Sequence, residues 1–118
     1  MSSDHKISEE IALLKDILVT KFGPKQIILF GSFAYGQPDV DSDIDVCVIM
    51  DFHGQRKIEV LRAMRRELAK SISSPLDILL YYEHEFEERA KLMGSLEYKI
   101  LTQGVKIYEQ SRVVARVV

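Results

Sequence analysis

Two aspartates, Asp43 and Asp45, follow a Gly31-Ser32 dipeptide after a spacer of ten residues. Apolar runs flank the two motifs, at 27–30 and 46–50, so the order reads as strand, turn, connection and strand. Residues i and i+2 of a strand point to the same face, and the two carboxylates therefore project together. Carboxylates roughly 7 Å apart repel each other, and one takes up a proton unless a cation lies between them. The pair thus indicates a Mg²⁺ site, because Mg²⁺ prefers a few hard oxygens together with substrate phosphates.

The Gly-Ser turn supplies the second half of a phosphate site. Gly31 allows a phosphate to approach the backbone closely, and Ser32 offers a hydroxyl and an N–H at the start of a short helix that includes residues 33–35. A phosphate cradle that faces paired carboxylates is the arrangement that metal-assisted nucleotidyl transfer requires. An Asp-x-Asp pair alone would be typical of a solvated acidic turn, but the flanking apolar runs favour the metal site.

These motifs resemble the signature of the DNA polymerase beta-like nucleotidyltransferase superfamily. More narrowly, they are similar to the minimal nucleotidyltransferases, the antitoxin-type partners of HEPN ribonucleases. The matching residues are Gly31-Ser32, Ala34, Gly36, Ser42-Asp43-Ile44-Asp45-Val46 and the closing segments 95–98 and 104–108. The resemblance covers nearly the whole chain. It departs from the family in the turn after Gly-Ser, where relatives often carry arginines and this chain has Phe33 and Tyr35.

The resemblance implies a third carboxylate on a neighbouring strand, and Asp77 within the run 76–80 is the candidate. A lone carboxylate in an apolar strand is itself costly unless it reaches water or a metal. By the resemblance, Asp43 and Asp45 hold two Mg²⁺ ions on a triphosphate, and Asp77 completes the catalytic metal site and helps to deprotonate the acceptor. Gly31 and Ser32 hold the outgoing phosphates.

The implied reaction moves a nucleoside monophosphate, AMP from ATP or the equivalent from another NTP, to a hydroxyl of a HEPN-type partner protein. An antitoxin or nucleotide-binding module without catalysis is the alternative. Antibiotic-modifying nucleotidyltransferases are a third possibility, but they need a further acceptor-binding domain.

The elements that position these residues alternate along the chain. Helical spacing of apolar residues predicts helices at 7–22, 56–72, 84–93 and 96–102, and apolar runs predict strands at 26–30, 44–50 and 76–81. Residues 105–108 form a short strand or an extended closing segment. We expect a single α/β (α+β) domain over residues 1–118, with a small mixed sheet of three to four strands and helices packed on one side.

Composition narrows the class of protein. The 118 residues carry a formal net charge of −2, which argues against a dedicated nucleic-acid binder. A single cysteine, Cys47, excludes an internal disulfide and is expected to pack in the sheet. The sequence has no apolar run of membrane-spanning length and no signal-peptide core, so we expect a cytoplasmic protein.

The sequence does not match three other ligand-binding motifs. A calcium loop beginning at Asp39 would need glycine and glutamate where Ile44 and Met50 stand, and the glycines match neither a P-loop nor a Rossmann fingerprint. Asp39 and Asp41 are interpreted as turn formers. The scattered histidines (His5, His53 and His84) are expected to be solvated.

Three further features have open interpretations. The basic residues of the helix at 56–72 are expected to form a solvated face paired with Glu59 and Glu67, although they could contact a nucleotide or an acidic partner. Phe33 and Tyr35 either stack on a base or partner or pack in the core. The apolar tail at 113–118 is compatible with self-association or docking, so a homo-oligomer is possible.

Overall fold

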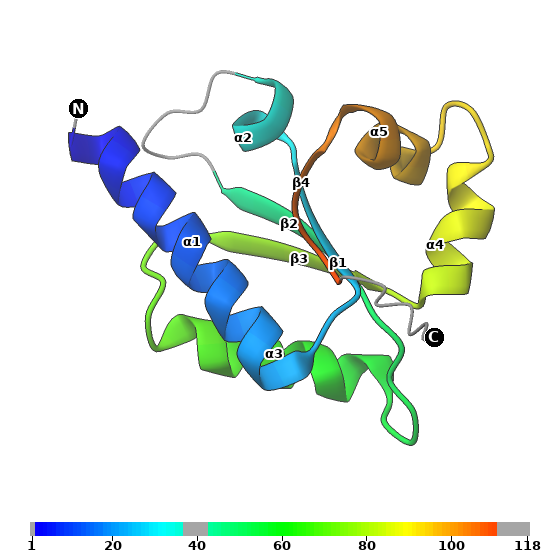
Figure 1. Ribbon diagram of the computed structural model, residues 1–118, viewed down its shortest axis with the longest axis horizontal. Coiled ribbons are helices and arrows are strands. Elements are labelled where there is room, and N and C mark those ends of the chain that lie inside the picture. Colours follow the sequence, from blue (N-terminus) through cyan, green and yellow to red (C-terminus); the bar gives the residue numbers. More distant parts are fainter. Residues whose placement is uncertain (1, 37–42, 111–118) are drawn as a thin grey trace, which may run out of the picture.

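Four strands form one mixed sheet with the order β3-β2-β1-β4 (Figure 1). The computed structural model describes residues 2–36 and 43–110. Its elements follow one another as α1 (Ser2–Phe22), β1 (Gln26–Phe30), α2 (Ser32–Tyr35), β2 (Ile44–Ile49), α3 (Lys57–Ala69), β3 (Leu76–Tyr81), α4 (Glu83–Ala90), α5 (Leu96–Gln103) and β4 (Val105–Glu109). The predicted α/β class with a mixed sheet is confirmed.

Strand directions follow from the connections between strands. β1 pairs antiparallel with β2 and with β4, whereas β2 pairs parallel with β3. A parallel pair requires a crossover connection, and α3 supplies it between β2 and β3. The closing segment is a strand at the edge of the sheet beside β1, with a register shift between Ile27 and Ile28.

Apolar residues cover both faces of the two central strands. On one face, Ile27, Val46 and their neighbours form the larger core with Leu14 of α1 and Met64 of α3. On the other face, Ile28, Cys47 and Ile49 pack with Phe86 of α4 and Ile100 of α5. Because β1 and β2 are apolar on both sides, each face needs a cover.

Helices therefore lie on both sides of the sheet. The two long helices α1 and α3 do pack together on one side, as expected, but α4 and α5 cover part of the opposite face (Figure 1). The expectation that all helices pack on one side is corrected in this respect. None of the helices in the described part of the chain is long and apolar enough to cross a membrane. The tail at 113–118 lies outside the described residues.

Glu10 joins α1 to the turn that leads into β3. Its side chain is only 7% exposed, and its carboxylate accepts hydrogen bonds from the backbone N–H and hydroxyl groups of Ser73 and Ser74. Burial by itself would raise the pKa of this carboxyl, but the hydrogen bonds from the two serines outweigh it and lower the pKa. The ionised carboxylate thus fixes the start of the strand that carries Asp77.

We predict that Glu10→Ala lowers the free energy of unfolding by roughly 2 kcal/mol, because it leaves the donors of the serine turn without their acceptor. Since the folded-state pKa is lowered, this stabilisation is present at neutral pH and is lost as the pH falls through the folded pKa. Urea denaturation at neutral and acid pH measures both effects. Asp16→Ala, at an exposed position of the same helix, is the matched control and should change stability by less than about 0.5 kcal/mol. Equal effects of the two substitutions would contradict the assignment.

Candidate active site

The Gly31 turn lies directly against the side chain of Asp45. Gly31 follows the last residue of β1 with a φ of 73°, and its carbonyl accepts hydrogen bonds from the N–H groups of Ala34 and Tyr35 at 3.0 Å. A Cβ atom at this position would lie 2.0 Å from Asp45 Oδ2. Both the backbone conformation and the close approach therefore require glycine. The structure thus brings the two halves of the predicted motif into contact.

Strand register places the third aspartate beside the second. Asp45 pairs with Phe30 on one side and with Asp77 on the other. Each aspartate is the second residue of its strand, and the amino ends of parallel strands meet at one end of the sheet. Asp45 alternates with the apolar residues that face α1 and α3, so its side chain lies on the opposite face, and the same holds for Asp77. Asp43, two residues before Asp45, shares this side by the same alternation.

Two carboxylates lie close enough to Asp45 to influence it. Burial raises the pKa of Asp45, and the negative charges of Asp77 and then of Asp43 raise it further. Asp45 is half-buried, whereas Asp43 and Asp77 are exposed. A nucleotide or a cation can therefore reach the carboxylates from solvent.

The carboxylates fit Mg²⁺ in donor type and in charge. The repulsion of Asp45 by its two acidic neighbours is what a divalent cation would relieve, and the carboxylate oxygens are the hard donors that Mg²⁺ prefers. Within residues 2–36 and 43–110, however, no group of three or more histidine, cysteine, aspartate or glutamate side chains is arranged to hold a metal ion. This is compatible with Mg²⁺ chemistry, because Mg²⁺ usually takes one or two carboxylates and completes its shell with waters and substrate phosphates.

Residues 11–114 match the family model described as "Nucleotidyltransferase domain". The chain belongs to this family. The predicted resemblance to nucleotidyltransferases is thereby confirmed, and nucleotidyl transfer is the activity after which the family is named. Among curated proteins, no significant match was found.

Two solved structures share the fold of this nucleotidyltransferase domain. One is the MntA–HpeT toxin–antitoxin complex, in a mutant with two aspartates replaced by glutamate. The matched chain of that structure is 20% identical in sequence to this one, with a TM-score of 0.54. The match covers 87% of this chain and 73% of the other. The second, from Sulfolobus solfataricus and assigned as a nucleotidyltransferase, is 19% identical, with a TM-score of 0.51 over 89% of this chain and 87% of the other.

The two aromatic residues that follow Gly31-Ser32 lie in different environments. Phe33 is partly buried and packs against the larger core, which confirms the core interpretation for this residue. Tyr35 is 37% exposed, and Lys99 Nζ of α5 lies 4.7 Å from its ring centroid. Sequence reasoning missed this contact, because no local signal links positions 64 residues apart.

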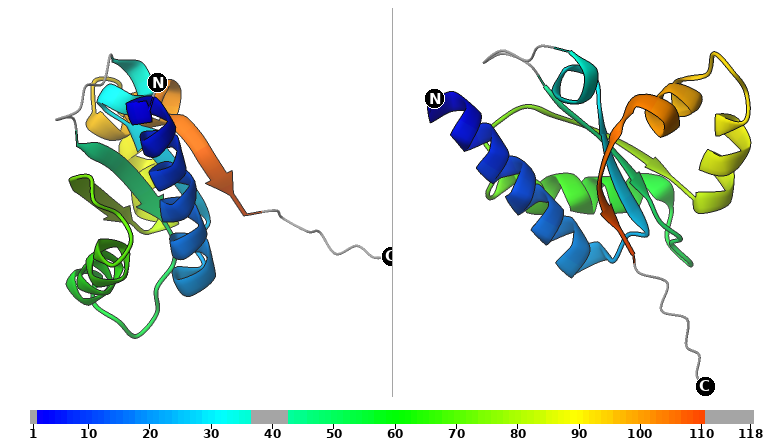
Figure 2. Two further views of the ribbon diagram at one scale, coloured as in Figure 1. Left: turned by 90° about the vertical axis from the view of Figure 1, so that its left-hand side faces the viewer. Right: turned by 45° about the horizontal axis from the view of Figure 1, so that its top comes forward.

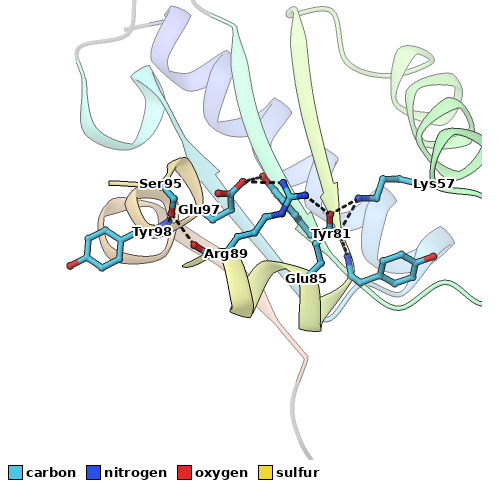
Figure 3. A network of polar contacts seen from close by, with 8 residues as sticks. Lys57, Tyr81, Glu85, Arg89, Ser95, Glu97 and Tyr98 are labelled. Carbon is cyan, nitrogen blue, oxygen red and sulfur yellow. Dashed lines mark hydrogen bonds and ion pairs between the residues drawn. The ribbon is translucent and has the colours of Figure 1, made fainter. Parts of the chain in front are cut away.

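A network of polar contacts, with a buried pair at its centre, joins α4 and α5 to the sheet (Figure 3). The hydroxyl of Tyr81 donates a hydrogen bond of 2.6 Å to Glu97 Oε2, and Glu97 is only 9% exposed. Arg89 lies 3.9 Å from Glu97 and 3.5 Å from Glu85, which also pairs with Lys57 at 2.9 Å. Sequence reasoning missed the role of Glu97, which resembles the exposed glutamates around it.

The described part of the nucleotidyltransferase domain also holds one buried cysteine and two exposed histidines. Burial, followed by the negative charge of Glu97, raises the pKa of the Cys47 thiol to about 12, so this cysteine stays protonated at neutral pH. Cys47 is free and buried in the sheet, as predicted. His53 and His84 are exposed, as expected, whereas the His5 side chain, Asp39 and Asp41 lie outside the described residues.

The basic helix α3 is partly paired, as expected. Arg56 contacts Glu59 at 3.5 Å, and Lys70 contacts Glu67 at 3.3 Å. These contacts support the interpretation of a solvated, ion-paired face.

We predict that Asp45→Asn raises the free energy of unfolding at pH 7 by roughly 0.5–1 kcal/mol in the absence of metal, at the lower end of what single stabilising substitutions commonly contribute. The reason is that a raised folded-state pKa means that ionised Asp45 destabilises the fold. This cost is present above the folded pKa and disappears as the pH falls and Asp45 becomes protonated. Thermal denaturation in EDTA at neutral and acid pH measures the effect.

Asp51→Asn is the control for this prediction. Asp51 pairs with Lys25 at 3.0 Å, and the hydrogen bond with Lys25 lowers its pKa, so its substitution should not stabilise the protein. Destabilisation by Asp45→Asn at pH 7 would show that the carboxylate cluster is not repulsive.

Proposed function

We propose that this protein is a Mg²⁺-dependent nucleotidyltransferase that moves a nucleoside monophosphate from an NTP to a hydroxyl of a partner protein. ATP is the expected donor and AMP the group that is transferred. A HEPN-type toxin is the expected partner. The observation that carries the proposal is the in-register pairing of Asp45 with Asp77, together with the contact between Asp45 and the Gly31 turn.

Each residue has a defined task in this proposal. Gly31 and Ser32 bind the phosphates that leave, and Asp43, Asp45 and Asp77 hold Mg²⁺. When bound, two Mg²⁺ ions neutralise the charge that develops on the phosphate oxygens. The acceptor oxygen forms a bond to the α-phosphorus, the bond from that phosphorus to the bridging oxygen breaks, and pyrophosphate leaves. Asp77, which is exposed at the amino end of β3, takes the proton of the acceptor hydroxyl.

An acceptor on a separate protein is supported by two observations. All four longer helices of the described residues pack on the sheet or on one another, so none of them stands apart as an acceptor-binding element. In addition, a chain of similar fold, MntA, is seen in a toxin–antitoxin complex. A toxin that presents a hydroxyl to the three carboxylates would supply both the acceptor and its orientation.

A second candidate function is an antitoxin that covers its partner without catalysis. The observation that favours it is the composition of the turn after Gly31-Ser32, where Phe33 and Tyr35 provide no positive charge for a triphosphate. The two functions differ in whether covalent transfer occurs, which an experiment can decide.

We predict that the purified protein, incubated with Mg²⁺ and ATP labelled on the α-phosphate, transfers label to its partner toxin. Asp43→Asn and Asp45→Asn should abolish the transfer, because each removes a metal-holding carboxylate. Gel autoradiography of the partner measures the transfer. Tight partner binding without transfer would favour the non-catalytic antitoxin, and rapid transfer to a free small molecule would contradict a protein acceptor.

Asp77→Asn separates the proton-accepting role from metal binding in the same assay. It should lower the turnover rate by about a hundredfold or more while changing NTP affinity much less, if Asp77 serves the attacking hydroxyl. An equal loss of affinity would show that Asp77 acts only through metal and NTP binding and not on the attacking hydroxyl, and full activity would make it structural.

A further inference from the structure

Lys99 places an unpaired positive charge beside the Gly31-Ser32 turn. Within residues 2–36 and 43–110, its ammonium has no carboxylate partner and lies 4.7 Å from the ring centroid of Tyr35. Other lysines of this region, such as Lys25, Lys57 and Lys91, form ion pairs with carboxylates at about 3 Å. The charge of Lys99 is therefore available to a ligand.

The position of Lys99 is determined by close packing of α5. At the end of this helix, a Cβ atom on Gly104 would lie 2.6 Å from Ile28 Cγ2 and 2.8 Å from the carbonyl oxygen of Leu29, so α5 ends in direct contact with β1. Near the start of α5, Glu97 accepts a hydrogen bond from the hydroxyl of Tyr81 in β3 (Figure 3). Ile100 between these points is fully buried. Lys99 therefore projects from a helix that is fixed relative to the sheet.

The ring that Lys99 contacts belongs to the phosphate turn itself. Ser32 and Tyr35 are three residues apart in α2, so they lie on neighbouring positions of one helical side. Gly31, immediately before Ser32, touches the carboxylate of Asp45. The two views of Figure 2 agree in placing α2 and α5 near one another at this end of the sheet. A phosphate chain that extends from the carboxylates along Ser32 would thus run toward Lys99.

We propose that Lys99 binds the outer phosphates of the nucleoside triphosphate and supplies the positive charge that the turn after Gly31-Ser32 lacks. This inference rests on the proposed nucleotide-binding function. The four-carbon stem of lysine is flexible and its ammonium is compact, so Lys99 can leave the ring face of Tyr35 and reach an anion bound at Ser32. In the free protein, the ring holds the ammonium near this position.

The test is calorimetric titration of the protein, in the presence of Mg²⁺, with a non-hydrolysable ATP analogue and, separately, with AMP. Lys99→Met should weaken binding of the ATP analogue roughly tenfold and leave AMP binding unchanged, because AMP has no outer phosphates. Lys99→Arg should keep most of the affinity. Lys91→Met removes an exposed lysine that pairs with Glu88 at 2.9 Å and should leave both affinities unchanged.

Several outcomes would overturn the proposal. Unchanged ATP-analogue affinity in Lys99→Met, while Asp45→Asn abolishes it, would remove Lys99 from the site and leave the proposed function intact. Equal losses for the ATP analogue and AMP would show a general effect on the site rather than a contact with outer phosphates. Weaker toxin binding with unchanged nucleotide affinity would make Lys99 a contact to an acidic partner surface. Failure of the wild-type protein to bind the ATP analogue would overturn both proposals.

Discussion

Parallel pairing of β2 with β3 is the constraint on which the rest of the site depends. It places Asp45 beside Asp77 at the amino ends of two neighbouring strands, and the antiparallel pairing of β1 then brings Gly31 against Asp45. A slip of one residue in either register would turn the side chains of the slipped strand to the other face of the sheet. The buried residues on both faces, such as Val46 and Cys47, oppose such a slip, because it would exchange the two cores.

The arrangement of carboxylates has an electrostatic cost that the rest of the domain offsets. Asp45 is partly removed from water beside two like charges, so its ionised form destabilises the fold. Glu10 illustrates the opposite case, because its buried carboxylate is matched by the donors of Ser73 and Ser74. A buried acid with partners positions an element, whereas a repelling group without a cation is typical of a functional site.

Most of the fold, and the residues of the candidate site that the structure brings together, could be predicted from local patterns. Apolar runs indicated the strands, and the Gly31-Ser32 and Asp43–Asp45 motifs indicated the turn and the acidic pair. What sequence reasoning missed depends on contacts between distant segments. Glu97 contacts Tyr81 and Arg89, and Lys99 contacts Tyr35, in each case across segments that no local pattern links. The packing of α4 and α5 on the second face likewise follows from apolar residues on both sides of the central strands, which periodicity does not assign to a partner.

The central claim is that the amino ends of β2 and β3, with the Gly31 turn, form the metal–nucleotide site. Paramagnetic broadening of backbone amide NMR signals by Mn²⁺, in the presence of a non-hydrolysable ATP analogue, tests it most directly. The account predicts broadening centred on Gly31, Asp45 and Asp77, with little effect at Lys57 near the other end of the sheet, and loss of the broadening in Asp45→Asn. Broadening centred on the exposed acidic residues Glu87 and Glu88 of α4, or broadening that persists in Asp45→Asn, would contradict it.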